Sequence, residues 1–218
     1  NYARQVNTLI GTKGVGLTSG YLYPGATYPY GMVQFTPSYF SKRSGFVINQ
    51  LSGGGCEHMG NFPTFPVKGK LKMSPDNILN YRINISEEKG HAGYYEAKVQ
   101  EDIHAKLTVT ERTGMASYEY PADQQYGTVI IGGGISATPI EQAAIVITAP
   151  NKCEGYAEGG NFCGLRTPYK VYFVAEFDTD ALESGTWKRD ELKPNTTFAE
   201  GEYSGVYFTF DVNKKKNI

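Results

Sequence analysis

The chain has 218 residues, in which 21 Lys and Arg side chains face 22 Asp and Glu side chains, for a formal net charge of −1. This balance excludes the large positive charge by which proteins bind a nucleic-acid backbone or an anionic membrane. No stretch approaches the roughly 20 apolar residues that span a bilayer. The first residues also lack a basic-then-apolar signal pattern, so we expect a leader to be absent or already removed.

The composition favours extended structure. The chain contains 26 glycines, 17 tyrosines and 11 phenylalanines. Glycine is typical of turns, and aromatic side chains are enriched in strands. The first 65 residues hold glycines among polar and aromatic residues, which predicts long loops between short strands. Residues 11–16 (GTKGVG) lack both the Lys-Ser/Thr pair and the following helix that a nucleotide-binding loop needs, so we exclude that function.

Alternating apolar residues then predict strands along the rest of the chain. Period-two alternation is typical of half-buried strands, and a continuous apolar run suits a strand that is covered on both faces. The predicted strands are 105–110, 128–131, 143–148, 169–177 and 206–212. The run at 169–177 is continuously apolar, so we expect it to be covered on both faces. The segment at 184–192 could hold a single helical turn at most. We therefore expect one all-β domain over residues 1–218, a large antiparallel β-sandwich with long Gly-rich loops.

Residues 51–61 (LSGGGCEHMGN) hold the densest group of functional side chains. Cys56, Glu57 and His58 are consecutive, so in extended backbone they alternate between two faces and cannot all bind one metal ion. A Cys-His nucleophilic pair would still need an orienting group and an oxyanion hole. Two interpretations remain: a tight turn with solvated polar tips, or a loop that contacts a sugar through Glu57, His58 and Asn61.

The three cysteines are too few for a disulfide scaffold. Cys153 and Cys163 enclose a Gly-rich stretch, and the spacing allows either a bridge between them or two unpaired thiols. Carboxylates give no clear catalytic pair, because the adjacent acids at 87–88 and 101–102 lie in polar surroundings that are typical of solvated turns.

Several segments, taken in order, resemble glycoside hydrolase family 92. The matching segments are VNTLIGT at 6–12, YPGATYPYGMVQFTP at 23–37, LSGGGC at 51–56, the run at 87–112, and RTPYKVYFVAEF at 166–177. They are collinear and cover most of the chain. Val15 and Leu17 stand in a stretch where the family usually has histidine, so the resemblance is to a divergent member.

The resemblance implies a secreted or periplasmic bacterial exo-α-mannosidase that requires calcium and inverts the anomeric carbon. Members have an N-terminal β-sandwich and a C-terminal (α/α)6 catalytic domain, which carries the catalytic carboxylates and most calcium ligands. We therefore expect no catalytic or metal-binding residue in this chain, and mannose-containing glycans and the catalytic domain as its partners. The alternative is a stand-alone carbohydrate-binding or surface-assembly module.

The family's Gly/Cys loop helps line the sugar pocket, and this places the expected substrate contacts. They are Cys56, Glu57, His58 and Asn61, with Phe62 as a stacking surface for the sugar ring. Without the catalytic domain, we expect the loop at 52–61 to be exposed to solvent.

Overall fold

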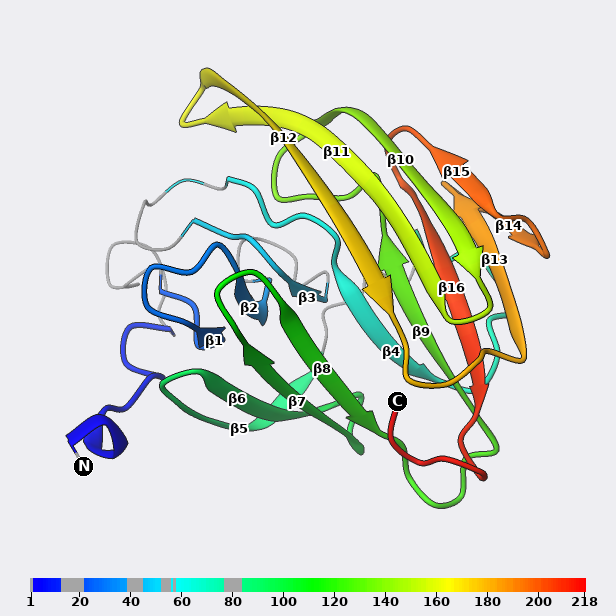
Figure 1. Cartoon of the computed structure of the whole chain (residues 1–218), viewed down its shortest axis with the longest axis horizontal. Coiled ribbons are helices and arrows are strands. Elements are labelled where there is room, and N and C mark those ends of the chain that lie inside the picture. Colours follow the sequence, from blue (N-terminus) through cyan, green and yellow to red (C-terminus); the bar gives the residue numbers. More distant parts are fainter. Residues whose placement is uncertain (1, 13–21, 39–44, 52–55, 57, 77–83) are drawn as a thin grey trace.

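A computed structural model of the chain describes residues 2–12, 22–38, 45–51, 56, 58–76 and 84–218. Almost all of its regular structure is β (Figure 1), and the one helix among these residues is a short 3-10 turn, η1, at Tyr2–Gln5. None of the described helices has the length and apolar character that crossing a membrane requires. The expectation of an all-β fold is confirmed.

Sixteen strands make up the described part of the fold. The first three strands are two to four residues long, as the glycine-rich composition there predicts, and the later ones are mostly longer. In chain order they are β1 (Ala26–Thr27), β2 (Gln34–Pro37), β3 (Phe46–Val47), β4 (Thr64–Lys68), β5 (Ile85–His91), β6 (Tyr94–Val99), β7 (Ile103–Val109), β8 (Gly114–Glu119), β9 (Tyr126–Gly132), β10 (Ile140–Ala149), β11 (Lys152–Phe162), β12 (Leu165–Glu176), β13 (Glu183–Lys188), β14 (Glu191–Pro194), β15 (Phe198–Glu200) and β16 (Ser204–Asp211).

The strands form three antiparallel sheets. An eight-stranded sheet has the order β1-β2-β3-β4-β9-β16-β13-β14, and two four-stranded sheets have the orders β5-β6-β7-β8 and β12-β11-β10-β15. Side chains of all three sheets line one groove, so the two smaller sheets cover the same face of the large one (Figure 1). This arrangement is an antiparallel β-sandwich.

Aromatic side chains join the layers. Phe46 of β3 packs against Tyr95 of β6 and Tyr118 of β8, with ring centroids 6.4 and 6.1 Å apart. On the other side, the Phe177 ring lies 5.0 Å from the rings of both Phe208 and Phe210 of β16. Such pairs add about 0.5–1.5 kcal/mol each beyond the burial of their apolar area. The core therefore holds both small sheets to the large one.

Strands occur at all five predicted positions, as β7, β9, β10, β12 and β16, although β7, β12 and β16 end one residue earlier than predicted. At 184–192, where the sequence allows at most one helical turn, β13 and β14 form a hairpin around Arg189 and Asp190, and β13 also pairs with β16. Two predictions of burial are wrong. The strand at 206–212 is not half-buried, because β16 lies between β9 and β13 in the large sheet and is buried on both faces. The strand at 169–177 is covered on one face only, because Tyr172 and Val174 point outward and are 69% and 61% exposed.

Candidate functional site

Residues 49–51 and 58–61 lie antiparallel to each other. Gln50 and Met59 pair as an isolated bridge, and the two asparagines that flank them lock the loop further. The Asn61 backbone N–H donates to the Asn49 side-chain oxygen at 2.8 Å, and the Asn49 amide nitrogen donates to the Asn61 side-chain oxygen at 3.1 Å. Gly60 has a φ of 75°, and an added Cβ would lie 3.3 Å from Ala137, so a larger residue would strain this turn.

A disulfide between Cys56 and Cys163 ties this loop to the β11–β12 hairpin, with the Cα atoms 5.5 Å apart. Cys163 and Gly164 are the two hairpin turn residues, and both have positive φ, as tight hairpin turns require. Neither arrangement that the spacing of Cys153 and Cys163 left open occurs, since Cys153 is buried and free while Cys163 has a distant partner. Burial raises the pKa of the Cys153 thiol to about 12.

His58 lies beneath the hairpin, and only 8% of it is exposed. Its ring packs against Phe162 of β11 and Tyr169 of β12, with both centroid distances 5.5 Å. Burial raises the pKa of Tyr169, and the nearby Asn61 and Ser136 side chains oppose this shift in part. The disulfide and these ring contacts together bring two hairpin strands over a loop that lies about a hundred residues earlier in the chain.

Several polar atoms in this region are buried without a hydrogen-bond partner. Within the described residues they include both amide atoms of Gln50, Nδ1 of His58, Nδ2 of Asn61 and Oγ1 of Thr138. We call Gln50, His58, Asn61, Thr138 and Tyr169 the polar cluster. A buried polar group without a partner costs about 1–3 kcal/mol, so such groups concentrate where a ligand or another protein part supplies the missing bonds.

The residues expected to contact a sugar do not lie as the sequence suggested. His58 and Asn61 are in the polar cluster, but they are buried, so the expectation of a solvent-exposed loop is wrong for these two residues. The physical reason is the hairpin, which the disulfide holds over them. Glu57 and residues 52–55 lie outside the described residues.

The other two expected contacts have structural partners. The Cys56 sulfur is bonded to Cys163 and has no thiol hydrogen to donate. The Phe62 ring stacks on Phe173 with centroids 4.0 Å apart and is 2% exposed, which leaves no free face for a sugar. The local sequence around Gln50, Thr138 and Tyr169 gives no sign of their place in the polar cluster, since nothing local distinguishes a polar residue that tertiary packing will bury.

The acidic residues are paired with lysines rather than with each other. The Glu87 carboxylate lies 2.7 Å from the Lys98 ammonium, and the hydrogen bond from Lys98 lowers the pKa of Glu87. Asp102 lies 2.9 Å from Lys68. A general acid in glycoside hydrolysis needs a raised pKa, so the shift at Glu87 is opposite to that requirement. These carboxylates are structural ion pairs on the surface.

The described residues contain no group of three or more His, Cys, Asp or Glu side chains placed to hold a metal ion. Calcium takes six to eight oxygen ligands, mostly carboxylates and carbonyls. No cluster of three carboxylates that could begin such a ligand set occurs in the described part of the chain.

Comparison with protein families decides what this sandwich is. Residues 5–218 match the model of the glycosyl hydrolase family 92 N-terminal domain. The chain belongs to this family. The match agrees with the motifs at 6–12, 23–37 and 51–56.

Solved family 92 structures show the same fold. An α-mannosidase of Bacteroides thetaiotaomicron superposes on 96% of this family 92 domain with a TM-score of 0.81, at 24% identity. A second enzyme of that bacterium, described as an inverting mannosidase, covers 99% of the chain with a TM-score of 0.80, also at 24% identity. At these identities the likeness shows the fold alone.

The chain spans only part of these relatives. It covers 31% and 30% of the two Bacteroides mannosidases. A curated relative, an uncharacterized secreted glycosidase of Arthroderma benhamiae, is 32% identical over 138 residues, which are 54% of this chain and 17% of that protein. The matched region of this family 92 domain is thus a minor part of each of these longer proteins.

Proposed function

We propose that this family 92 domain is the N-terminal part of a secreted exo-acting α-mannosidase, in which it supports a C-terminal helical catalytic domain and lines part of its sugar pocket. The observation that carries the proposal is the family match over residues 5–218, together with a fold shared with α-mannosidases of about three times its length. The Arthroderma relative, a secreted glycosidase, supports secretion and the general reaction class.

The polar cluster is the part of this domain that we assign to the sugar pocket. Its unpaired amide, imidazole and hydroxyl atoms are of the types that hydrogen-bond sugar hydroxyls or the backbone of a docked domain. It also includes two of the residues, His58 and Asn61, that the family resemblance places at the pocket. In this arrangement the disulfide fixes the loop, and the hairpin residues Phe162 and Tyr169 hold the His58 ring in place.

We propose that most calcium ligands of such an enzyme lie in the C-terminal catalytic domain, as the family resemblance implies. When bound, calcium would supply Lewis-acid contacts to sugar oxygens. The residues of this chain would contribute orientation and the exclusion of water, which strengthens every polar contact to the substrate.

The test replaces Gln50 with Leu in the longer protein. Leu has a similar size and removes both unpaired amide atoms, so the free energy of unfolding should stay constant or rise by up to about 1 kcal/mol. If Gln50 gains its partners at the pocket, kcat/KM for an α-mannoside should still fall at least tenfold. The control Gln124→Leu, in the turn before β9, should change neither quantity.

The activity of the unsubstituted longer protein is the second part of the test. It should release mannose from a simple aryl α-mannoside with inversion of the anomeric carbon. NMR of the anomer that appears first measures this outcome. Glycan binding without hydrolysis would overturn the proposal in favour of a carbohydrate-binding module. An unchanged kcat/KM in Gln50→Leu would remove the polar cluster from the pocket but leave the reaction class standing.

A further inference from the structure

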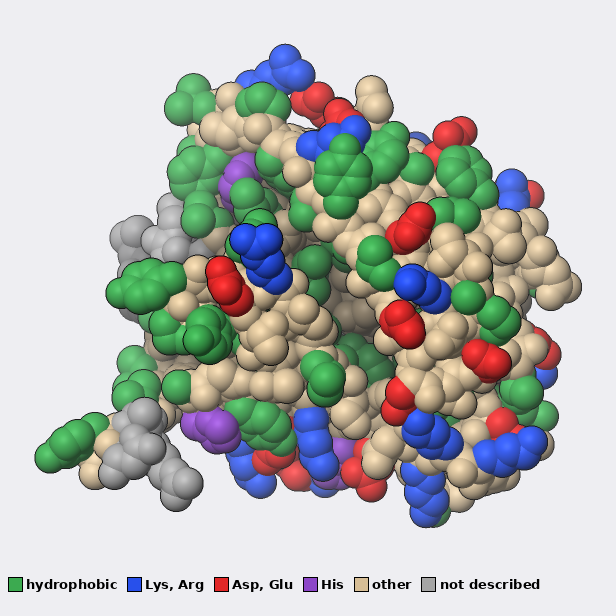
Figure 2. All heavy atoms as spheres, in the orientation of Figure 1, with side chains coloured by type: hydrophobic (Ala, Val, Ile, Leu, Met, Phe, Trp, Pro, Cys, Tyr) green, Lys and Arg blue, Asp and Glu red, His purple; other side chains and the backbone are tan. Residues whose placement is uncertain are grey.

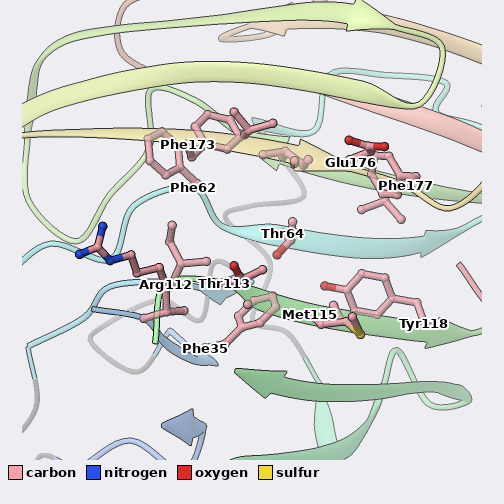
Figure 3. A pocket seen from close by; sticks show the side chains of 18 of the residues that line it. Phe35, Phe62, Thr64, Arg112, Thr113, Met115, Tyr118, Phe173, Glu176 and Phe177 are labelled. Atoms are coloured by element: carbon pink, nitrogen blue, oxygen red, sulfur yellow. The ribbon is translucent and has the colours of Figure 1, made fainter. Parts of the chain in front are cut away.

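A groove separates the two four-stranded sheets. β8 is the last described strand of one sheet and β12 is the last of the other, and residues of both line a cavity of about 600 Å³. Its floor comes from the eight-stranded sheet, through Phe35, Val129 and Ile131. The surface is hollowed here in Figure 2, and Figure 3 shows side chains around β8 and β12 facing each other across the space. We call this the inter-sheet groove.

Both strands present backbone groups to the groove. The Tyr118 N–H donates to the Ile218 carbonyl, so the backbone hydrogen-bonding groups of Tyr118 point away from β7. By alternation, the backbone groups of Ala116 and Gly114 also point away from β7. On the opposite side, the Phe177 N–H donates to the Asn151 carbonyl next to β11, so the backbone groups of Phe177 point toward β11. By alternation, the backbone N–H and C=O of the preceding residue, Glu176, point toward the groove. Free edges of this kind are templates for another strand.

The last residues of the chain already pair with one edge. The N–H groups of Tyr118 and Tyr120 donate to the carbonyls of Ile218 and Lys216 at 2.7 and 3.0 Å, and the Ile218 N–H donates back to the Tyr118 carbonyl at 3.1 Å. Asn217 faces Glu119 as an antiparallel bridge. Ile218 is 8% exposed and lines the groove itself. The backbone direction at 216–218 therefore leads into the groove along β8.

The two edges have a compatible orientation. β8 and β12 run in the same direction in Figure 1, and the C-terminus lies beside the ends of both. A single strand between them would be antiparallel to each, because it would run back from Ile218. The apolar floor and the inward-facing Phe173, Ala175 and Phe177 would cover one of its faces.

We propose that the inter-sheet groove receives a further β-strand, formed by the residues that directly follow Ile218 in the longer polypeptide. Four strands, the new strand and four strands then give one nine-stranded antiparallel sheet, β5-β6-β7-β8-new-β12-β11-β10-β15. The inference rests on the proposed function only in taking the chain to be the first part of a longer protein. It does not depend on which reaction that protein catalyses.

The pairing at 217 and 218 fixes the register of the new strand. Continued antiparallel pairing sets Ser117, Ala116 and Met115 opposite the first, second and third residues after Ile218. Because opposed residues point to the same face, the second residue enters the groove with Ala116, and the third points outward with Met115, which is 66% exposed. The second and fourth residues after Ile218 should thus be apolar.

Disulfide trapping in the longer protein tests this register. Met115→Cys combined with a cysteine at the third position after Ile218 places two Cβ atoms at a non-hydrogen-bonded pair, where the Cα atoms lie about 4.5 Å apart. Mild oxidation should cross-link this pair almost completely, as shown by peptide mass spectrometry. The control moves the second cysteine to the second position, which points to the other face, and should cross-link at least tenfold less.

Hydrogen exchange of the unsubstituted longer protein gives an independent measurement. The peptide over residues 112–118 should exchange at least a hundredfold more slowly than an unpaired edge. Fast exchange would overturn the proposal, and so would equal cross-linking of the two pairs. Protection without cross-linking would also overturn it, and a dimeric mass would then identify a second copy as the occupant. A cross-linked protein without α-mannosidase activity would refute the proposed function and leave the strand standing.

Discussion

At the scale of single residues, His58 is the clearest case of a site residue with a structural role. Its ring is buried between Phe162 and Tyr169, so His58→Ala removes two ring contacts and leaves a cavity. We expect a loss of about 1–3 kcal/mol in the free energy of unfolding, measured by urea denaturation. The matched control is His104→Ala, at an exposed position of β7, which should change the free energy of unfolding by less than about 0.5 kcal/mol. Equal effects of the two substitutions would contradict the packing described for His58.

One buried thiol and two buried tyrosine hydroxyls predict a loss of stability at alkaline pH. Burial raises the pKa of the Cys153 thiol to about 12, and burial also raises the pKa values of Tyr118 and Tyr120. The unfolded chain ionises these groups first, so the stability that their neutral forms contribute is complete below the unfolded pKa values and is lost as the pH rises toward the folded values. Unfolding free energy should therefore fall as the pH rises from about 8.5 through 11.

Tyr118→Phe isolates one of these contributions. The Tyr118 hydroxyl is buried without a partner in hydrogen-bond geometry, so its removal should cost little at pH 7. The variant should lose less stability than the unsubstituted chain between pH 9 and pH 11, in urea titrations at fixed ionic strength. An identical pH dependence would show that Tyr118 ionises normally in the folded protein.

At the scale of elements, the disulfide decides how the β11–β12 hairpin sits. It joins residues 107 positions apart, and closing a loop of about 100 residues lowers the entropy of the unfolded chain by an amount equivalent to about 4.7 kcal/mol in the chain-entropy model. Replacing both Cys56 and Cys163 by Ser should lower the unfolding free energy by about 3–5 kcal/mol and expose His58.

The control for the disulfide is Cys153→Ala, which leaves the bridge intact.

Thiol labelling of the unsubstituted chain tests the bridge directly. The Cys153 side chain is buried, so a thiol reagent should label the native chain slowly and the denatured chain fully, with one thiol per chain. Two or three reactive thiols after denaturation without reductant would show that the bridge does not form.

At the scale of the whole molecule, the 218-residue chain alone should not hydrolyse α-mannosides. Inversion needs two carboxyl groups about 6.5–9.5 Å apart with a water between them, and the acids at 87 and 102 are instead paired with Lys98 and Lys68. The assay is mannose release by the purified chain beside the longer protein. Chelation of calcium should abolish the activity of the longer protein only. Calcium-dependent release by the 218-residue chain would contradict both expectations.

The sequence by itself determined the strands and the family of this protein. Period-two alternation at 105–110 and 206–212 is a local property that indicates a strand, because successive side chains point to opposite faces. It does not determine how many faces are covered, since β7 buries one face and β16 buries both. The collinear motifs at 6–12, 23–37 and 51–56 were likewise visible without coordinates, and they indicated the family that the match over 5–218 establishes.

Only the tertiary structure decided which distant segments meet. The partner of Cys163 is Cys56 rather than nearby Cys153, the polar residues His58 and Asn61 are buried, and β12 is an edge strand with one open face. No local pattern encodes these outcomes, because they depend on how three sheets stack and on which loop the β11–β12 hairpin covers. Burial of a polar side chain is set by what packs over it, and in this fold the covering strands lie about a hundred residues further along the chain.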